Sequence, residues 1–229
     1  MCFDDDLIRE QIAYYRARAG EYDEWWTRTG RYDRGPAQRA RWSNEIAVVE
    51  RALSAQAPLG TVLELACGTG IWTERLAPIA DRVRAIDVSP EVIVLNRARV
   101  NAANVDYQLA DVFDQPDIEA ADFIFFAFWL SHVPRSRFES FWRFVRRSLR
   151  PRGRVFFIDS LPEPTSTAVD HALDDTGRVR RRLNDGRAFN IVKLFYEPAD
   201  LASMLAGLGW RPDVRSTGTY FMYGTAEPS

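Results

Sequence analysis

The stretch from Val62 to Thr73 decides the fold, and it reads Val-Leu-Glu-Leu-Ala-Cys-Gly-Thr-Gly-Ile-Trp-Thr. An apolar run passes through the acidic Glu64 and a turn of small residues into the start of an amphipathic helix, which predicts a strand–loop–helix unit. Gly68 and Gly70 carry no Cβ, so the loop backbone can adopt unusual φ angles and approach a ligand closely. Several cofactor folds share such a loop, so the residues downstream must identify the ligand.

Downstream of this loop the hydrophobic pattern alternates between strands and helices. We expect strands at 61–65, 83–87, 105–109, 122–127 and 154–159, with helices at 71–79, 89–102 and 135–149 between them. A helix at 197–208 precedes two final strands, at about 210–217 and 219–225, which can pair as an antiparallel hairpin. The pattern predicts an α/β fold, with a Rossmann-like, doubly wound sheet of seven strands that is mostly parallel.

Two further regions flank this repeat. Helical patterns at 4–28 and 37–56 predict an N-terminal helical cap over residues 1–58, so that 59–229 forms the cofactor-binding domain. Within that domain, 160–196 interrupts the rhythm and is expected to form a lid. Strand-like runs at 178–183 and 187–196 flank Asn184-Asp185-Gly186, which is a hairpin signal.

The composition is that of an ordinary globular protein. The chain has 229 residues, of which 46% are hydrophobic and 27% charged, with a net charge of −2. No apolar run reaches the roughly 18–20 residues that a membrane-spanning helix needs, and the acidic N-terminus lacks the pattern of a signal peptide. With only Cys2 and Cys67, we expect no disulfide framework and a cytoplasmic location. His and carboxylate residues are not clustered at ligand spacing, so no metal is expected.

Carboxylates follow successive strands of the predicted sheet. Glu64, Asp87 and Asp111 stand at or just beyond strand ends, and the carboxyl ends of parallel strands form one ligand-binding edge. A carboxylate at Asp87 can accept hydrogen bonds from both hydroxyls of a ribose. Asp111, one strand further on, can accept from the exocyclic amine of adenine.

At this point the pattern is similar to that of the class I S-adenosylmethionine-dependent methyltransferases. The matching segments, between about residues 60 and 160, are Glu64–Gly70, Ile86–Ser89, Ala110–Val112, the apolar fourth strand and Leu149–Gly153. Ala66 is a departure, since the family's pattern often has a glycine there. The resemblance implies S-adenosylmethionine as cofactor and methyl transfer as activity.

The resemblance also assigns residues. It implies that the glycine loop lies against the methionine and ribose parts of the cofactor, that Asp87 holds the ribose, and that Asp111 and Val112 contact the adenine. Tyrosines of the N-terminal helices can cover the cofactor with rings that face the sulfonium, or they can be core aromatics. The expected cofactor-binding residues are Tyr14, Tyr22, Glu64, Ala66, Gly68, Gly70, Thr73, Asp87, Val88, Ser89, Asp111, Val112, Ala127 and Phe128.

Two alternatives remain open. A nicotinamide-dependent oxidoreductase uses a similar fold, but its fingerprint needs a third glycine where Thr73 stands, and it gives no reason for Asp111. A non-catalytic, cofactor-binding regulatory protein would bind the same cofactor without transferring a methyl group.

The acceptor is expected to be a small molecule that is methylated at oxygen or nitrogen by in-line displacement. Such an enzyme must align the acceptor with the methyl group and, for a hydroxyl acceptor, remove a proton. His132 follows the fourth strand and can act as the general base, or it can shape the pocket or contact the substrate. The expected acceptor-binding residues are Tyr15, Trp25, Trp129, His132 and Tyr220, unless these aromatics belong to the core.

A basic cluster lies in the predicted lid, at Arg178, Arg180, Arg181, Arg182 and Arg187. It could clamp an anionic acceptor or contact nucleic acid, or it could form a solvated face of the hairpin. A slightly acidic chain with no dedicated appendage argues against nucleic acid. The expected partner is therefore a small molecule, with no nucleic acid and no membrane, whereas the acceptor's identity and the oligomeric state stay open.

Overall fold

The computed structural model describes residues 3–168, 171 and 177–229 and contains a central seven-stranded sheet. In spatial order, its strands are β3 (Val105–Leu109), β2 (Ala80–Asp87), β1 (Leu59–Leu65), β4 (Ala121–Ala127), β5 (Leu149–Ser160), β9 (Phe221–Pro228) and β8 (Trp210–Ser216). The first five are parallel, and β9 runs antiparallel to both of its neighbours. The predicted doubly wound sheet with an antiparallel C-terminal hairpin is confirmed.

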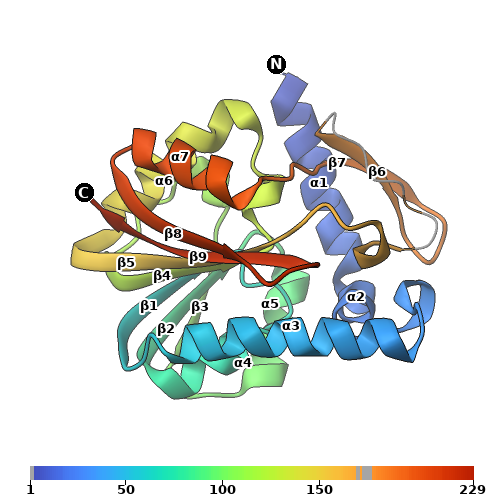
Figure 1. Cartoon of the computed structure of the whole chain (residues 1–229), viewed down its shortest axis with the longest axis horizontal. Helices are drawn as coiled ribbons and strands as arrows, with labels where there is room; N and C mark the ends of the chain where they lie inside the picture. The colour runs from blue at the N-terminus through green and yellow to red at the C-terminus, as the bar shows by residue number, and fades with distance from the viewer. Residues whose placement is uncertain (1–2, 169–170, 172–176) are drawn as a thin grey trace.

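The sheet is covered on both faces, which is why β4 is nearly continuously apolar. Phe123 and Phe125 belong to the core beneath α3 (Pro36–Ser54) and α4 (Thr73–Leu76). Ile124 and Phe126 belong to the opposite core, beneath α6 (Phe138–Arg147) and α7 (Pro198–Gly207). Figure 1 shows these two helical layers on either side of the sheet.

The helices that follow β1 and β2 differ in how closely they match the ranges expected from the sequence. Ser89 caps α5 (Pro90–Val100), as expected, because its hydroxyl accepts a hydrogen bond from the Val92 amide. The helix expected at 71–79 is shorter, since α4 covers only four residues and passes into the 3₁₀ turn η3 (Ala77–Ile79). Pro78 lacks the amide hydrogen that an α-helix would need there.

The helical segment expected over 4–28 is interrupted in the structure. The structure has α1 (Phe3–Arg18), a 3₁₀ turn η1 (Ala19–Glu21) and α2 (Tyr22–Thr27), followed by η2 (Gly30–Tyr32). Gly20 lies in the break, and glycine costs roughly 1 kcal/mol relative to alanine inside a helix. The break lets α1 cross the carboxyl ends of the strands while α2 lies near α3 (Figure 1).

The hairpin predicted in the lid region is confirmed. Strands β6 (Arg178–Arg182) and β7 (Ala188–Val192) pair antiparallel and lie beside α1 (Figure 1). Residues 169–170 and 172–176 of the predicted lid 160–196, and residues 1–2 of the predicted cap, lie outside the described residues. The remaining 3₁₀ turns are η4 (Val112–Asp114), η5 (Leu130–His132), η6 (Arg135–Arg137) and η7 (Pro164–Ser166).

Polar contacts fasten α1 to this hairpin. Glu10 accepts a hydrogen bond from the Asn190 amide at 2.6 Å. Gln11, which is buried, accepts from the Val192 amide at 3.0 Å and donates to the carbonyl of His132 at 3.2 Å. The N-terminal helix and the hairpin therefore form one cover over the carboxyl edge of the sheet.

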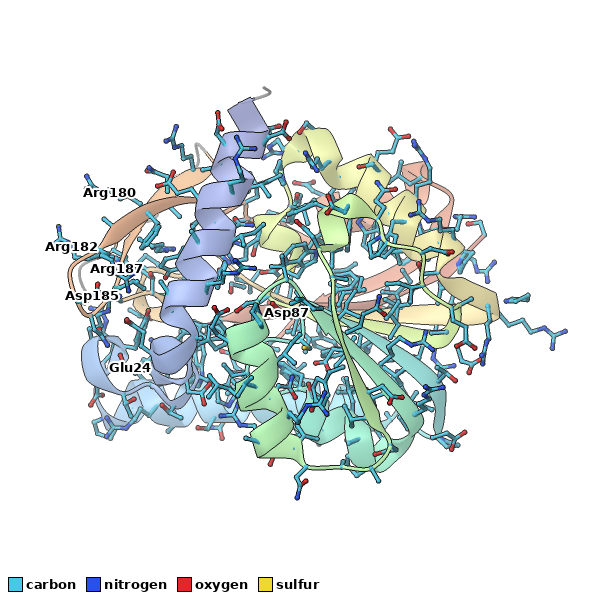
Figure 2. The ribbon with its side chains drawn as sticks, turned by 180° about the vertical axis from the view of Figure 1, so that it is seen from behind. Glu24, Asp87, Arg180, Arg182, Asp185 and Arg187 are labelled. Atoms are coloured by element: carbon cyan, nitrogen blue, oxygen red, sulfur yellow. The ribbon has the colours of Figure 1, made fainter. Side chains whose placement is uncertain are left out.

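The arginines of β6 point in opposite directions. Successive side chains of a strand alternate between its faces, so Arg181 is buried whereas Arg180 and Arg182 are exposed. Figure 2 shows Arg180, Arg182 and Arg187 at the outer side of the hairpin, where Arg187 pairs with Asp185. The expected solvated face accounts for most of the cluster, and Arg181 is its inward member. No helix in the described ranges is long and apolar enough to cross a bilayer.

Candidate active site

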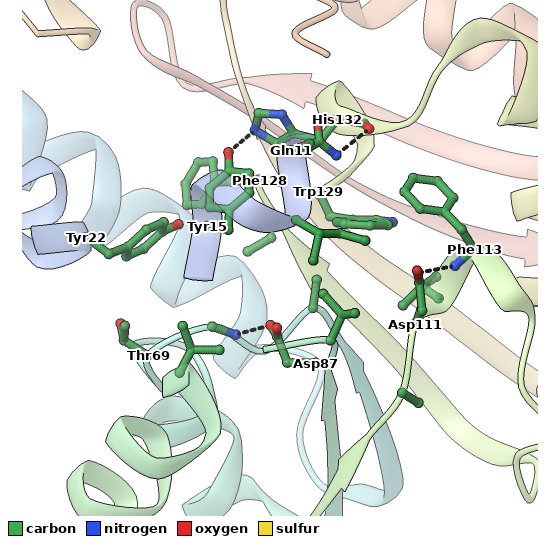
Figure 3. A pocket seen from close by; sticks show the side chains of 18 residues that line it. Gln11, Tyr15, Tyr22, Thr69, Asp87, Asp111, Phe113, Phe128, Trp129 and His132 are labelled. Atoms are coloured by element: carbon green, nitrogen blue, oxygen red, sulfur yellow. Dashed lines mark hydrogen bonds between the residues drawn. The ribbon is translucent and has the colours of Figure 1, made fainter. Parts of the chain in front are cut away.

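A first cavity opens at the carboxyl ends of the parallel strands and holds about 780 Å³ of empty space, part of it open to solvent. The glycine loop and the end of β2 form its floor, and α1 covers it (Figure 3). The turn after β4 supplies one wall, and the segment after β3 supplies another. The edge predicted from the strand ends thus encloses a ligand-sized space.

Asp87 anchors the glycine loop at the floor of the first cavity. Its two carboxylate oxygens accept hydrogen bonds from the amides of Gly68, at 3.0 Å, and Ser89, at 2.9 Å. Carboxylate oxygens have further lone pairs, so Asp87 keeps acceptor capacity for a ligand. Burial raises the pKa of Asp87 to about 6.

The backbone of this loop has a positive φ at Ala66, Gly68 and Gly70, the last at +92°. Gly68 has a φ of +54°, and the non-glycine Ala66 has a φ of +52°. A Cβ built on Gly68 would meet no atom within 4 Å, because that side of the loop faces open space. The missing side chain therefore exposes loop backbone to a ligand.

The segment after β3 and the turn after β4 supply an apolar surface beside one carboxylate. Asp111 accepts a hydrogen bond from the Phe113 amide at 2.8 Å, and burial raises the pKa of its carboxyl group. The rings of Phe113 and Trp129 lie 5.0 Å apart, centroid to centroid, and both line the first cavity together with Val112. An aromatic base can stack on such a surface, with Asp111 at its edge.

A third cavity of about 350 Å³ shares Ala66, Gly68 and Thr69 of the glycine loop with the first, and it is lined in part by Glu64. Glu64 is buried and accepts a hydrogen bond from the Thr73 hydroxyl at 2.7 Å. Burial raises the pKa of Glu64 to about 8.

A second cavity, of about 590 Å³, lies between α1, the β6–β7 hairpin and the end of β5. Three cationic side chains line it and are each 9% exposed or less: Arg18, Arg181 and Lys193. Nη1 of Arg181 is buried and has no hydrogen-bond partner among the described residues. The second cavity is therefore strongly basic.

Lys193 is the only lysine of the chain. Its ammonium donates to the Ser131 hydroxyl at 2.8 Å and lies 3.7 Å from the buried carboxylate of Asp159. Burial, and secondarily the charge of Arg181, lowers the pKa of Lys193 to about 8 despite the attraction of Asp159.

His132 lies between the first and second cavities and lines both. Its Nδ1 is 2.6 Å from the carbonyl oxygen of Val192, and its Nε2 is 2.7 Å from the Tyr15 hydroxyl (Figure 3). Burial and the nearby charge of Lys193 hold the pKa of His132 well below its usual value. The imidazole is therefore neutral at pH 7.

Tyr22 and Phe128 line all three cavities. Phe128 directly follows β4 and has a φ of +54°, which is rare for a residue with a bulky side chain. Its amide donates to the Ile158 carbonyl at 2.7 Å, and its ring packs edge-to-face on Trp25 at 4.7 Å. These contacts hold the Phe128 ring where the cavities meet.

Most of the expected site residues line at least one cavity, but the structure places five of them differently. Tyr14 lines the second cavity and not the first. Four others line none of these three cavities, namely Gly70, Thr73, Ser89 and Tyr220. Thr73 donates a hydrogen bond to Glu64, Ser89 caps α5, and Tyr220 packs on Trp42. In the described part of the chain, no group of His, Cys, Asp or Glu is arranged to hold a metal ion.

Other lining residues were not among the expected ones. Arg18 and Gln11 lie on α1, and only the long-range packing of α1 brings them to the cavities. Arg181 stood in the basic cluster without being distinguished from its neighbours. Lys193 had one signal in the sequence, its uniqueness, although nothing there indicated burial beside Asp159.

Comparison with known proteins agrees with this geometry. Residues 62–153 match a family profile described as a methyltransferase domain. The structure of DhpI in complex with S-adenosylhomocysteine (SAH) is 40% identical, covers 97% of this chain and 97% of its own, and superposes with a TM-score of 0.79. A DhpI–SAM–HEP complex superposes equally well, with a TM-score of 0.79.

More distant relatives align over part of their length. Nodulation protein S of Rhizobium tropici is 31% identical over 131 residues, which are 56% of this chain and 52% of that protein. The ubiquinone biosynthesis O-methyltransferase of Xanthomonas axonopodis pv. citri (strain 306) is 29% identical over 152 residues, 65% of this chain and 61% of that enzyme. Our chain thus spans less than two thirds of these curated relatives. DhpI matches along nearly the whole chain, and the fold and glycine loop are those expected. The alternative of a nicotinamide-dependent oxidoreductase is therefore rejected. The chain belongs to the class I S-adenosylmethionine-dependent methyltransferases.

Proposed function

We propose that this enzyme methylates an oxygen or nitrogen of a small anionic molecule bound in the second cavity. The observation that carries the proposal is the burial of Arg18, Arg181 and Lys193 around one space. Buried charges are costly unless they are paired, and Asp159 is the only carboxylate that makes an ion pair with any of the three among the described residues. An anionic acceptor would supply the missing negative charge.

The first cavity fits S-adenosylmethionine on its own geometry. The apolar surface of Val112, Phe113 and Trp129 would hold the adenine, with Asp111 accepting from its amine. Asp87 would accept the ribose hydroxyls. The open face of Gly68 would receive the methionine chain, whose ammonium would reach Glu64 in the adjoining third cavity.

The second cavity would hold the acceptor's anionic group. Arg181 has an unpartnered Nη1, and guanidinium groups form charge-assisted, often bidentate, hydrogen bonds with carboxylates and phosphates. Lys193 would add a point charge, since it is protonated below its pKa of about 8. Arg18 lies 4.9 Å from the Tyr22 ring centroid and completes the basic wall.

Tyr15, Tyr22 and Phe128 line both the first and the second cavity, so they would surround the point where the two ligands meet. When bound, the cofactor supplies a methyl group activated by its sulfonium charge. The three aromatic side chains would exclude water and align the acceptor atom, and such alignment is the main requirement of an in-line displacement. Electron-rich ring faces also favour a nearby cation.

We propose that His132 orients Tyr15 and the acceptor and is not a general base. A general base must take up a proton, and protonating the His132 imidazole would place a further positive charge beside Lys193 in a buried space. Burial and the charge of Lys193 lower the pKa of His132 for this reason, so the imidazole is a poor base. An acceptor whose reacting atom is already anionic, or is an amine with a free lone pair, needs no strong base.

The names of the relatives are compatible with methylation at either oxygen or nitrogen. The Xanthomonas relative is an O-methyltransferase, and a NodS structure that shares this fold at 19% identity is described as an N-methyltransferase. DhpI has been crystallised with SAM and HEP together, which agrees with two adjoining cavities for two ligands.

The test is an acceptor series in matched pairs. Small carboxylates and phosphate monoesters are incubated with S-adenosylmethionine beside their neutral esters or amides, and SAH formation and the added methylene mass are measured. We expect turnover of anionic members only. Arg181→Gln should raise KM for the acceptor at least tenfold and leave the SAH affinity within about twofold. Equal turnover of neutral and anionic members would contradict the proposal.

A further inference from the structure

We infer that Asn96 is a positioning residue that shapes the glycine loop and keeps one oxygen of Glu64 available for the amino-acid end of the cofactor. The inference rests on the proposed contact between Glu64 and the cofactor's ammonium. Asn96 lies on α5, is fully buried and lines none of the three cavities. Its effect must therefore pass through its neighbours.

The side-chain amide of Asn96 ties three parts of the loop together. Its nitrogen lies 2.8 Å from the Thr73 hydroxyl, 3.1 Å from the carbonyl of Gly68 and 3.4 Å from that of Cys67. The two amide hydrogens serve Thr73 and Gly68 best, and the longer contact to Cys67 is shared. The carbonyl groups on the inner side of the glycine loop are thus held by one side chain.

The carbonyl groups of Gly68 and Cys67 fix which end of the amide faces the loop. Carbonyl oxygens only accept, so the amide nitrogen of Asn96 must point toward them. Oδ1 of Asn96 then faces the Tyr107 hydroxyl, which donates to it at 2.8 Å.

The direction of these hydrogen bonds continues to Glu64. The Thr73 hydroxyl receives a hydrogen bond from Asn96, so its single hydrogen is directed at Oε2 of Glu64, 2.7 Å away. Oε2 is thereby occupied as an acceptor, and the other oxygen of Glu64 remains for a ligand in the third cavity. The chain of donors runs in one direction, from Tyr107 through Asn96 and Thr73 to Glu64.

Gly70 gives an independent indication of how closely Asn96 approaches the loop. A Cβ at Gly70 would lie 2.7 Å from Oδ1 of Asn96 and 2.8 Å from its Cγ, which are impossible contacts. Gly70 therefore accommodates Asn96 and not the cofactor, which explains why it lines none of the three cavities.

Asn104 offers a matched control. Its side-chain nitrogen donates to the carbonyls of Ala77 and Ala80 at 2.9 and 3.0 Å, so it also holds backbone carbonyls, but in a turn away from the cavities. A role limited to stability would make Asn96 and Asn104 equivalent in ligand-binding experiments.

The experiment compares two ligands by isothermal titration. SAH carries the amino-acid part, whereas 5′-methylthioadenosine has the same nucleoside and thioether without it. We expect Asn96→Ala to weaken SAH binding about tenfold or more, because a hydrogen bond from the charged ammonium of the ligand is disturbed, and 5′-methylthioadenosine binding by no more than about twofold. Asn104→Ala should lower the thermal midpoint and leave both affinities unchanged.

Equal weakening of both ligands by Asn96→Ala, or no weakening of SAH, would overturn the inference. Tyr107→Phe removes one hydroxyl group and replaces Asn96→Ala as the test if Asn96→Ala does not fold. We expect it to lower the affinity for SAH alone, by about threefold. An equal loss of affinity for both ligands counts against the role of Asn96. Glu64→Gln separates the two proposals. If Glu64→Gln leaves SAH affinity intact, the contact of Glu64 with the cofactor fails; if it weakens SAH while Asn96→Ala does not, only the role of Asn96 fails.

Discussion

The hydroxyl group of Tyr15 lies 2.7 Å from Nε2 of His132, whose Nδ1 lies 2.6 Å from the carbonyl oxygen of Val192. A carbonyl only accepts hydrogen bonds, so Nδ1 carries the hydrogen and Nε2 accepts from Tyr15. The ring is thus a fixed neutral acceptor that joins α1 to the strand β7. We propose that its function at the acceptor site is to orient Tyr15.

We therefore expect His132→Gln to keep turnover within about tenfold of the wild-type value, because a glutamine carbonyl can still accept from Tyr15. His132→Ala should lose more, and Tyr15→Phe should resemble it. Initial rates at saturating cofactor measure this. A loss of about a thousandfold in His132→Gln, as expected on removal of a general base, would contradict the orienting role.

The second prediction concerns Asp87 and low pH. Its pKa is raised to about 6 by burial, so the carboxylate is ionised above pH 6 and protonated below it. If the ionised form binds the ribose, SAH affinity should fall about tenfold between pH 7 and pH 5. Titration calorimetry across this range measures the effect. In Asp87→Asn the affinity should be low and this pH-dependent step absent; an unchanged step in the variant would assign it to another group.

The third prediction concerns Lys193 and high pH. Its pKa is lowered to about 8, so its positive charge is present below pH 8 and lost above it. KM for the anionic acceptor should therefore rise about tenfold between pH 7 and pH 9. Arginine stays protonated throughout this range, so Lys193→Arg should show no such rise. A parallel rise in both proteins would exclude Lys193 as its cause.

The fourth prediction uses two neighbouring positions with the same backbone conformation. Ala66 has a φ of +52° and Gly68 a φ of +54°. This conformation costs a residue with a side chain roughly 1–2 kcal/mol, and a change to glycine removes that cost. Glycine also loses more backbone entropy on folding, which offsets roughly 0.5–1 kcal/mol of the gain. Ala66→Gly should therefore leave the free energy of unfolding unchanged or raise it by up to about 1.5 kcal/mol.

Gly68→Ala is its counterpart. It should lower the free energy of unfolding by up to about 1.5 kcal/mol. It should also weaken SAH binding, because its Cβ would enter the space that faces the ligand. Chemical denaturation and calorimetry of the two variants provide the comparison. Normal SAH affinity in Gly68→Ala would mean that the open face of Gly68 does not contact the cofactor.

The sheet and one edge of the site follow from local sequence patterns. Alternating apolar runs define the parallel strands, and the carboxyl ends of such strands meet, so the positions of Gly68, Asp87 and Asp111 could be predicted from sequence alone. The helix break at Gly20 and the short α4 were missed because hydrophobic periodicity continues across both. Periodicity reports which side of a segment is buried and not where its hydrogen bonds end.

The acceptor side could not be derived in this way. Arg181 is buried while Arg180 and Arg182 are exposed, and only the pairing of the hairpin with α1 decides which face turns inward. Lys193 and Asp159 are neighbours through tertiary contact alone. The sequence around Asn96 indicates only an ordinary helical residue, because its hydrogen bond to the Gly68 carbonyl is a tertiary contact.

The two main cavities are oppositely charged: Asp87 and Asp111 line the first, and Arg18, Arg181 and Lys193 line the second. If the reacting atom of the acceptor is an anionic oxygen, each cavity prefers its substrate to its product, because the ligand facing the carboxylates ceases to be a sulfonium cation and the ligand facing the basic groups gives up negative charge. Turnover thus weakens the electrostatic attraction on both sides of Phe128 at once. The enzyme should accordingly be limited little by product release, and inhibition by its own methylated product should be weak.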